Sequence, residues 1–87
     1  MSEQTERCWL VERDFYDEDL VTLVYATPDG KRHLTQQRST ALLMQGTVTA
    51  AIDVDTEDLE EVDSSNIERY AQEATRMADR HDPDDEI

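Results

Sequence analysis

The chain has 87 residues, of which 22 are Asp or Glu and only eight are Lys or Arg, so its net charge is −14. This length predicts one domain with a small core. The negative charge excludes direct binding of nucleic acid, because such binding draws its affinity from Lys and Arg placed on phosphates.

The same composition predicts a protein adapted to a very salty cytoplasm. At about 1 M salt the Debye length is only about 3 Å, so surface carboxylates hardly repel one another, whereas in dilute buffer they push a compact state apart. Lys31 is the only lysine, and exposed carboxylates would hold water and diffuse cations. The mean hydropathy is −0.80, and a chain with so little apolar surface to bury could be disordered at low salt.

Residues 1–7 are polar and are expected to form a flexible N-terminus, without the apolar core of a signal peptide. Alternation then predicts a strand over residues 8–16, with Trp9, Val11 and Phe15 on one face and Glu12 and Asp14 on the other. The sequence has no run of 18 apolar residues. We therefore expect a cytoplasmic protein that does not span a membrane.

After an acidic turn at residues 17–19, residues 20–27 form the most β-prone segment of the chain and are apolar on both faces. Val21, Leu23 and Tyr25 share one face, and Leu20, Val24 and Ala26 share the other. Such a strand belongs in the middle of a sheet. Pro28, Asp29 and Gly30 predict a tight turn, with Gly30 in the left-handed conformation, and the hairpin partner is residues 31–36.

The apolar run at residues 41–44 predicts a short helix within residues 36–45, ended by Gly46, although a buried strand is an open alternative. Alternation resumes over residues 47–54, where a fourth strand points Val48, Ala50, Ile52 and Val54 inward. Residues 55–63 are a carboxylate-rich connector.

A long amphipathic helix follows. Ser65 to Glu68 matches a capping box, and an apolar stripe continues with helical spacing; its members are Ile67, Tyr70, Ala71, Ala74, Met77 and Ala78. Arg80 and His81 suit the negative end of the helix dipole, and Pro83 ends the helix. Residues 82–87 form a short acidic tail that we expect to fray.

These elements predict an α+β domain over residues 8–81, with the order β-β-β-α-β-α. The expected architecture is a mostly antiparallel four-stranded sheet with the C-terminal helix packed on one face. If the short helix does not cover the other face, a second copy of the chain is the expected cover. The predicted self-association surface is therefore Cys8, Leu10, Leu20 and Val24.

No cofactor or metal motif is found in the sequence. The carboxylates from Asp53 to Asp58 resemble a calcium loop, but the sixth position lacks glycine and the twelfth is Ser64. His33 and His81 lack the spacing of metal ligands. Cys8 is more typical of a small buried apolar residue than of a reactive thiol.

Two other classes of function stay open. A small enzyme or ligand binder could assemble a site from His33, Arg32, Arg38 and the carboxylates of the turn formed by Asp17, Glu18 and Asp19. The acidic surface could also imitate nucleic acid and occupy a basic partner.

Three segments, residues 23–30 (LVYATPDG), 47–54 (TVTAAIDV) and 78–85 (ADRHDPDD), resemble a family of small, uncharacterised acidic proteins of halophilic archaea. The resemblance implies salt adaptation and a cytoplasmic location, and it implies no reaction, ligand or functional residue. The leading hypothesis is a non-enzymatic domain that acts through protein contact, as a homodimer or as an accessory subunit.

Overall fold

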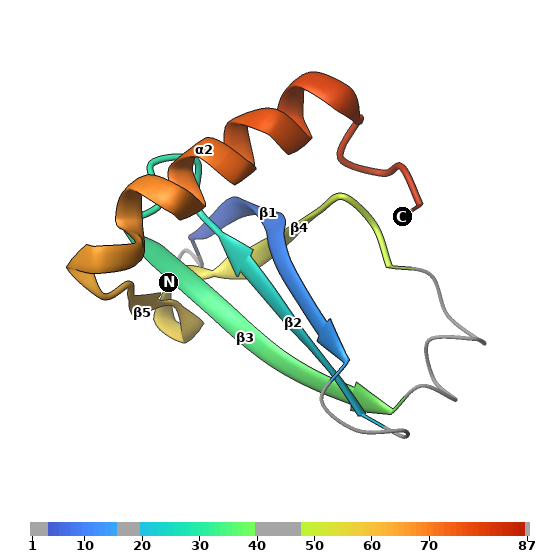
Figure 1. The fold of residues 1–87 in the computed structure, drawn as a ribbon, viewed down its shortest axis with the longest axis horizontal. Helices are drawn as coiled ribbons and strands as arrows, with labels where there is room; N and C mark the ends of the chain where they lie inside the picture. The colour runs from blue at the N-terminus through green and yellow to red at the C-terminus, as the bar shows by residue number, and fades with distance from the viewer. Residues whose placement is uncertain (1–3, 16–19, 40–47, 87) are drawn as a thin grey trace.

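The computed structural model describes residues 4–15, 20–39 and 48–86. Its elements are arranged in two layers, a five-stranded sheet and a helix that crosses one face of the sheet, mainly over the first strand (Figure 1). In chain order they are β1 (Thr5–Phe15), β2 (Leu20–Ala26), β3 (Arg32–Ser39), β4 (Ala51–Asp55), the 3-10 turn η1 (Thr56–Asp58), β5 (Glu60–Glu61) and α2 (Ser64–Arg80).

The predicted α+β class and the antiparallel sheet are confirmed, but the prediction of four strands is wrong. The strand order is β4-β1-β2-β3-β5, and every neighbouring pair is antiparallel. The additional strand, β5, lies in the acidic segment predicted to be a connector. The doubly apolar β2 is the central strand, as its two-sided pattern predicts.

Three other boundaries differ from the prediction. β1 begins at Thr5, so residues 5–7, predicted to belong to a flexible N-terminus, are part of the first strand. A short helix was predicted within residues 36–45, with a strand as the alternative; residues 36–39 belong to β3, which ends at Ser39, and the apolar run at residues 41–44 lies outside the described residues. The strand predicted over residues 47–54 is β4, Ala51–Asp55. Ala50 and Ala51 pack toward the helix, whereas Ile52 and Val54 pack on the other face, so the alternation starts only at Ala51.

The sheet is strongly curled at the end where β4 leads into β5. These two strands form opposite edges, which a flat five-stranded sheet would hold about 19 Å apart. Only η1 and Leu59 join Asp55 to Glu60, and these five steps span at most about 17 Å even when fully extended. Because part of the connection is a 3-10 turn with a smaller rise, the two edges must bend toward each other.

The curl buries an apolar core on the inner face, which is the face turned away from α2. The buried residues there are Cys8, Leu10, Val21, Leu23, Tyr25 and Val54. Leu34, Ile52 and Leu59 pack against them, and the Arg32 guanidinium reaches the Glu6 carboxylate at 2.7 Å across the same face. The described part of one chain therefore already buries most of the face for which a second copy was the expected cover.

The helix face of the sheet carries the other two groups of buried side chains. Trp9, Ala50 and Ala51 pack against Ala74, and Val24, Ala26 and Val62 pack against Tyr70. Ala50 and Ala51 on the sheet side and Ala74 on the helix are small, so α2 lies close to β1. The apolar stripe predicted for the helix is confirmed except at its end, because Ala78 is exposed.

A β-bulge at Val11 changes which side chains of β1 face the helix. Leu10 pairs with Tyr25 and Glu12 pairs with Val24, so Val11 is the extra residue of the pair. Glu12 consequently lies on the helix face, where its carboxylate contacts Arg69 of α2 at 3.1 Å. The prediction that Glu12 points away from the core side was wrong, because one inserted residue reverses the alternation.

The helix begins earlier than predicted. Its N-cap is Asp63, whose side chain accepts a hydrogen bond from the Ser65 backbone N–H at 3.3 Å, so the capping box predicted at Ser65 does not form. A carboxylate in this position also stabilises the helix, because its negative charge lies at the positive end of the helix dipole. The C-cap is His81, in agreement with the predicted end of the helix.

The acidic segment after α2 is held to the sheet rather than frayed. The Ala50 N–H donates to the Asp85 carbonyl at 2.9 Å, and the Ala51 N–H donates to the Pro83 carbonyl at 3.1 Å. Thr49 and Glu86 form an antiparallel bridge, and His81 Nδ1 lies 3.8 Å from an Asp85 carboxylate oxygen. The tail therefore protects the outer edge of residues 49–51.

Candidate functional site

The four residues of the predicted self-association surface do not form one surface. Cys8 and Leu10 are buried on the inner face, and Val24 is buried on the helix face. Leu20, opposite Ser39 on the same side of the sheet as Val24, is 37% exposed. Of the four, only Leu20 is available for contact with another protein.

The Cys8 side chain is fully buried in the core on the inner face of the sheet. Burial raises the pKa of its thiol to about 11, and the nearby Glu6 carboxylate adds to this increase. The thiol is thus held in its neutral, unreactive form at physiological pH, in agreement with the interpretation of Cys8 as a small buried apolar residue.

The Cys8 thiol should react with a thiol reagent at pH 8 more than about 100-fold more slowly in the native protein than in the guanidinium-denatured chain, because the thiolate is the reactive form. Since the folded pKa lies above the unfolded one, the neutral thiol stabilises the fold below pH 9, and this stabilisation is lost as the pH rises toward 11. Absorbance-monitored labelling checks the rate; equal rates in both states would contradict the burial.

The residues of the predicted catalytic or ligand site do not converge. Arg32 lies on the inner face against Glu6, whereas His33 lies on the other face of β3, with Nδ1 3.1 Å from the Thr35 hydroxyl. Arg38 is six residues further along, about 20 Å from Arg32, and its guanidinium donates to Gln36 Oε1 at 3.0 Å. The acidic turn at residues 17–19 lies outside the described residues.

Metal coordination has no candidate site in the described parts of the chain, which contain no group of three or more His, Cys, Asp or Glu side chains close enough to hold an ion. The stretch that resembles a calcium loop is divided between β4 and η1.

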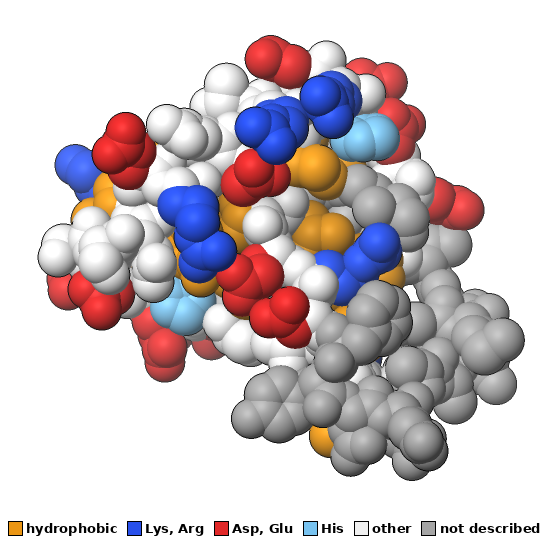
Figure 2. Space-filling model, in the orientation of Figure 1, with side chains coloured by type: hydrophobic (Ala, Val, Ile, Leu, Met, Phe, Trp, Pro, Cys, Tyr) orange, Lys and Arg blue, Asp and Glu red, His pale blue; other side chains and the backbone are white. Residues whose placement is uncertain are grey.

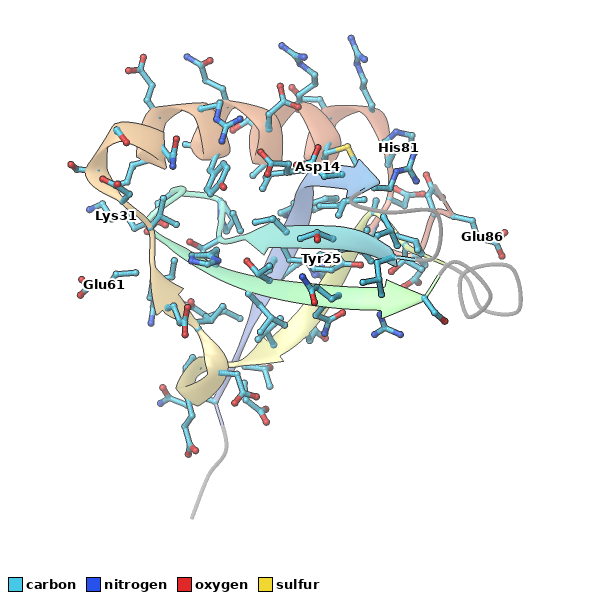
Figure 3. All side chains as sticks on the ribbon, turned by 60° about the horizontal axis from the view of Figure 1, so that its bottom comes forward. Asp14, Tyr25, Lys31, Glu61, His81 and Glu86 are labelled. Atoms are coloured by element: carbon cyan, nitrogen blue, oxygen red, sulfur yellow. The ribbon has the colours of Figure 1, made fainter. Side chains whose placement is uncertain are left out.

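A shallow pocket of about 410 Å³ lies at the end of the β2–β3 hairpin. It is lined by Asp29, Lys31, Arg32, Glu61, Val62 and Ile67, and Figure 3 shows Lys31 and Glu61 at this end of the sheet, next to the start of α2. Two cations balance two carboxylates, and Arg32 is already paired with Glu6. The lining therefore gives no preference for an anionic or a cationic ligand.

The turn beside this pocket is held by a compact hydrogen-bond network around buried Thr27. The Thr27 hydroxyl donates to the Asp29 carboxylate at 2.6 Å and accepts from the Arg32 N–H at 3.2 Å. The Lys31 N–H donates to the same Asp29 oxygen at 2.9 Å. The Thr27 hydroxyl and then the Lys31 N–H hold the pKa of Asp29 below its ordinary value. This network is structural, because it rigidifies the start of β3.

Among the described residues, one feature that remains open to a partner is the outer edge of β3. β5 pairs with β3 only at Arg32 and His33, so no described strand lies beside β3 from Leu34 onward; Figure 1 shows β5 beside only the start of β3. A strand edge without a neighbour presents backbone donors and acceptors to any extended segment that can add to it.

The hydrogen bonds at the start of β3 identify which backbone groups point outward. The Lys31 carbonyl accepts from the Val62 N–H, on the β5 side, whereas the Arg32 carbonyl accepts from the Thr27 N–H, on the β2 side. Since the direction alternates along a strand, the N–H and C=O groups of Thr35 and Gln37 point outward. Both residues are exposed.

This edge belongs to a segment whose composition differs from that of the rest of the chain. Residues 30–52 contain no Asp or Glu, although the chain has 22 of them, and they include Lys31, Arg32 and Arg38. This acid-free segment can be seen in the sequence, but it extends over the predicted hairpin partner at residues 31–36 and the segment 36–45, for which helix and strand stay open, so the sequence does not place it on one strand edge. It is the one signal by which sequence reasoning could have located the edge.

Outside this segment, the charges are mixed. Arg7 contacts Asp53 at 3.7 Å, and Arg76 contacts Glu73 at 3.1 Å. On the face drawn in Figure 2, basic and acidic side chains lie beside one another. A nucleic-acid mimic would need carboxylates alone at phosphate-like spacing, and this face does not present that arrangement. No helix among the described residues is long and apolar enough to cross a bilayer.

Comparison with known proteins identifies a family but no relative of known function. Neither the curated proteins nor the solved structures contain a match to this chain. A family model described as "Family of unknown function (DUF7967)" matches residues 2–87, which is nearly the whole sequence. The match does not show a halophilic archaeal origin, which stays a prediction. The chain belongs to this family of unknown function.

Proposed function

We propose that this protein is a small, non-enzymatic contact domain that receives an extended segment of a partner along the outer edge of β3. The observation that carries the proposal is the pair of residues Thr35 and Gln37, whose backbone groups point outward beside no described strand. Strand addition to such an edge supplies main-chain hydrogen bonds, and alternate side chains provide specificity.

The low acidity of this edge supports the proposal. A protein with a net charge of −14 repels other acidic proteins at the short range that concentrated salt leaves unscreened, and this repulsion is smallest where no carboxylate is present. The outer edge of β3 lies inside the acid-free segment, residues 30–52. The backbone groups of Thr35 and Gln37, which face no described strand, therefore lie where the local electrostatic barrier to a partner is weakest.

The positions of the chemically useful side chains also favour contact over catalysis. Arg32 and His33 lie on opposite faces of β3, and each already has a polar partner in Glu6 or Thr35. The Cys8 thiol is buried and neutral. The composition places the domain, in this proposal, in a cytoplasm of high ionic strength, where surface carboxylates serve hydration.

Replacing Thr35 with proline should abolish partner binding while the fold is retained. The Thr35 N–H points outward, so proline removes a donor to the partner and none to β2, and proline is tolerated on an edge strand in this orientation. Tagged wild-type, Thr35→Ala and Thr35→Pro chains would be purified from the protein's own cytosol. We expect a stoichiometric companion with the first two and a loss of about ten-fold or more with Thr35→Pro.

Thr35→Ala is the matched control, because it removes the side chain and keeps the N–H. Circular dichroism verifies that all three chains fold. A companion retained equally by Thr35→Pro would show that binding does not use this edge, and the absence of any companion, including an untagged copy of the chain itself, would refute the contact function.

A further inference from the structure

We infer that the segment received by β3 is an acidic, extended segment of another protein, which places a carboxylate opposite Arg38. This inference rests on the proposed function, since it names the chemistry of the partner for the same edge. The pairing of β5 ends at His33, and Leu59, just before β5, packs with Leu34 against the inner core. The received segment is therefore placed opposite residues 35–38, where it does not overlap with β5.

Arg38 is an exposed cation on the inner face of the sheet, at this outer edge. It pairs with Val21 of β2, whose side chain belongs to the inner core. The Arg38 Nε and Nη2 atoms donate to Gln36 Oε1 at 3.3 and 3.0 Å. Gln36 thus orients the guanidinium along the strand.

The charge of Arg38 is not compensated by these hydrogen bonds, because the Gln36 amide is neutral. Among the described residues, no carboxylate lies within ion-pair distance of Arg38, whereas Arg32 lies 2.7 Å from Glu6. The two bonds to Gln36 also leave N–H groups of the guanidinium for a further acceptor. A carboxylate is the acceptor that matches both the charge and the planar shape of this group.

The strand geometry places a partner side chain beside Arg38. Every neighbouring pair in the sheet is antiparallel, and the backbone groups of Thr35 and Gln37 point outward, so these two residues would form the hydrogen-bonded pairs with the segment. Arg38 would then face its partner residue in a non-hydrogen-bonded pair, with Cα atoms about 4.5 Å apart and the side chains on the same face. A carboxylate in that position forms a cross-strand ion pair.

The charges at the two ends of the edge determine where the carboxylate of the partner lies. Glu60 and Glu61 of β5 are exposed beside the start of β3, about 17 Å along the strand from Arg38. They repel a carboxylate there, whereas Arg38 attracts one. In an antiparallel pair, the residue opposite Arg38 is the first of the received segment, so the acidic residue lies at its N-terminal end.

The described acidic segments of this chain are already engaged, which favours another protein over a second copy. Asp85 and Glu86 lie along the edge of residues 49–51, and Glu60 and Glu61 form β5. A second copy would have to release one of these contacts before it could supply the segment.

Three short, capped, threonine-rich peptides are the probes for this inference; they differ only in one residue near the N-terminus, which is glutamate, glutamine or lysine. Titrations in about 1 M KCl, where the Debye length is about 3 Å, are followed by NMR at the amide protons of Thr35 and Gln37. We expect both protons to shift. The glutamate peptide should bind about two- to five-fold more tightly than the glutamine peptide, the range for a cross-strand pair of opposite charges, and the lysine peptide should bind most weakly.

The variant Arg38→Glu should reverse this order, so that the lysine peptide binds most tightly. Arg80→Glu is the matched control, because Arg80 is also exposed but lies on α2, and the substitution changes the net charge equally. It should keep the order of the wild-type chain. Circular dichroism verifies folding, and Arg38→Gln, which should remove the difference between the glutamate and glutamine peptides, replaces Arg38→Glu if that variant does not fold.

Equal binding of the three peptides, or tighter binding of the lysine peptide by the wild-type chain, would overturn the inference. An equal loss of preference in Arg38→Glu and Arg80→Glu would also overturn it, because the preference would then come from the net charge and not from a contact with Arg38.

The failure of this inference can be distinguished from the failure of the proposed function. If the peptides shift Thr35 and Gln37 without a preference for glutamate, the edge receives extended segments, and only the acidic partner is wrong. If the companion captured from cytosol is an untagged copy of this chain, the partner is a second copy, and the inference is again wrong. If no peptide shifts these amides and Thr35→Pro keeps its companion, both the inference and the proposed function are wrong; if Thr35→Pro loses its companion, only the inference is wrong.

Discussion

Raising the KCl concentration from about 0.1 M to about 2 M should raise the midpoint of thermal unfolding by roughly 10 °C, equivalent to about 2 kcal/mol for a domain of this size. The reason is the net charge of −14 on 87 residues, which destabilises the compact state through self-repulsion when screening is weak. The few exposed ion pairs, such as Arg7–Asp53, offset little of this repulsion. Circular dichroism during a potassium titration measures the effect.

A charge-reduced chain is the control for this titration. Glu57, Asp58 and Asp84 are exposed carboxylates, and the triple variant Glu57→Gln, Asp58→Asn, Asp84→Asn should be more stable than the wild type at low salt and depend less on salt. An equal midpoint for the wild-type chain from dilute buffer to brine would show that the carboxylates do not limit its stability, and salt adaptation would lose its physical basis.

Replacing Gly30 with alanine should lower the free energy of unfolding by about 2–4 kcal/mol, a combination of backbone strain and overpacking. Gly30 has a φ of 73°, in the region that L-residues adopt at a cost. A Cβ added there would overlap the Ile67 carbonyl oxygen and lie 2.6 Å from the backbone N of Ala71. Both atoms belong to the backbone of α2, so the contact cannot be relieved by a side-chain rotation.

Denaturant unfolding in high salt measures this loss, and Pro28→Ala in the same turn is the control. Pro28 is exposed, so its replacement should cost only about 0.4–1 kcal/mol, through greater freedom of the unfolded chain. A Gly30→Ala variant as stable as Pro28→Ala would mean that the hairpin does not press against α2 as the structure has it.

The Gly30 contact also bears on the proposed function. The turn at residues 27–31 fixes the start of β3, and the close approach of Gly30 to α2 fixes the turn. β3 is thereby held in a defined register with β2 up to Ser39, and a strand that is ordered before binding loses less conformational entropy when a partner adds to its edge. The acid-free composition and the rigid hairpin favour the same surface.

Several elements followed from local sequence alone. The two-sided apolar pattern of Leu20 to Ala26 predicted the central strand, the Pro-Asp-Gly turn predicted the left-handed Gly30, and the apolar stripe from Ile67 predicted α2. In each case the determining interactions are between residues close in sequence, or the pattern repeats over many residues, so the local signal is strong. The net negative charge follows directly from the composition.

Other features depend on partners distant in sequence. Val11 is a bulge only because β1 must match β2 around Tyr25 and Val24, and Glu60 and Glu61 form a strand only because the curled sheet brings them to the edge of β3. Residues 36–39 carry no strong strand pattern, yet they extend β3 because β2 offers a matching ladder. Tertiary pairing overrode weak local preference in all three.

The candidate site likewise combines features set by the local sequence with features set by the tertiary structure. By itself the sequence determined the charge, the acid-free segment and the residues able to form strands, because these are properties of composition and of period-two or helical spacing. Only the tertiary structure decided that Cys8, Leu10 and Val24 are buried within one chain and that no described strand lies beside β3 from Leu34 onward. Burial and edge exposure depend on the curl of the sheet, which is set by the short connection from Asp55 to Glu60 and by long-range pairing, and no local pattern encodes it.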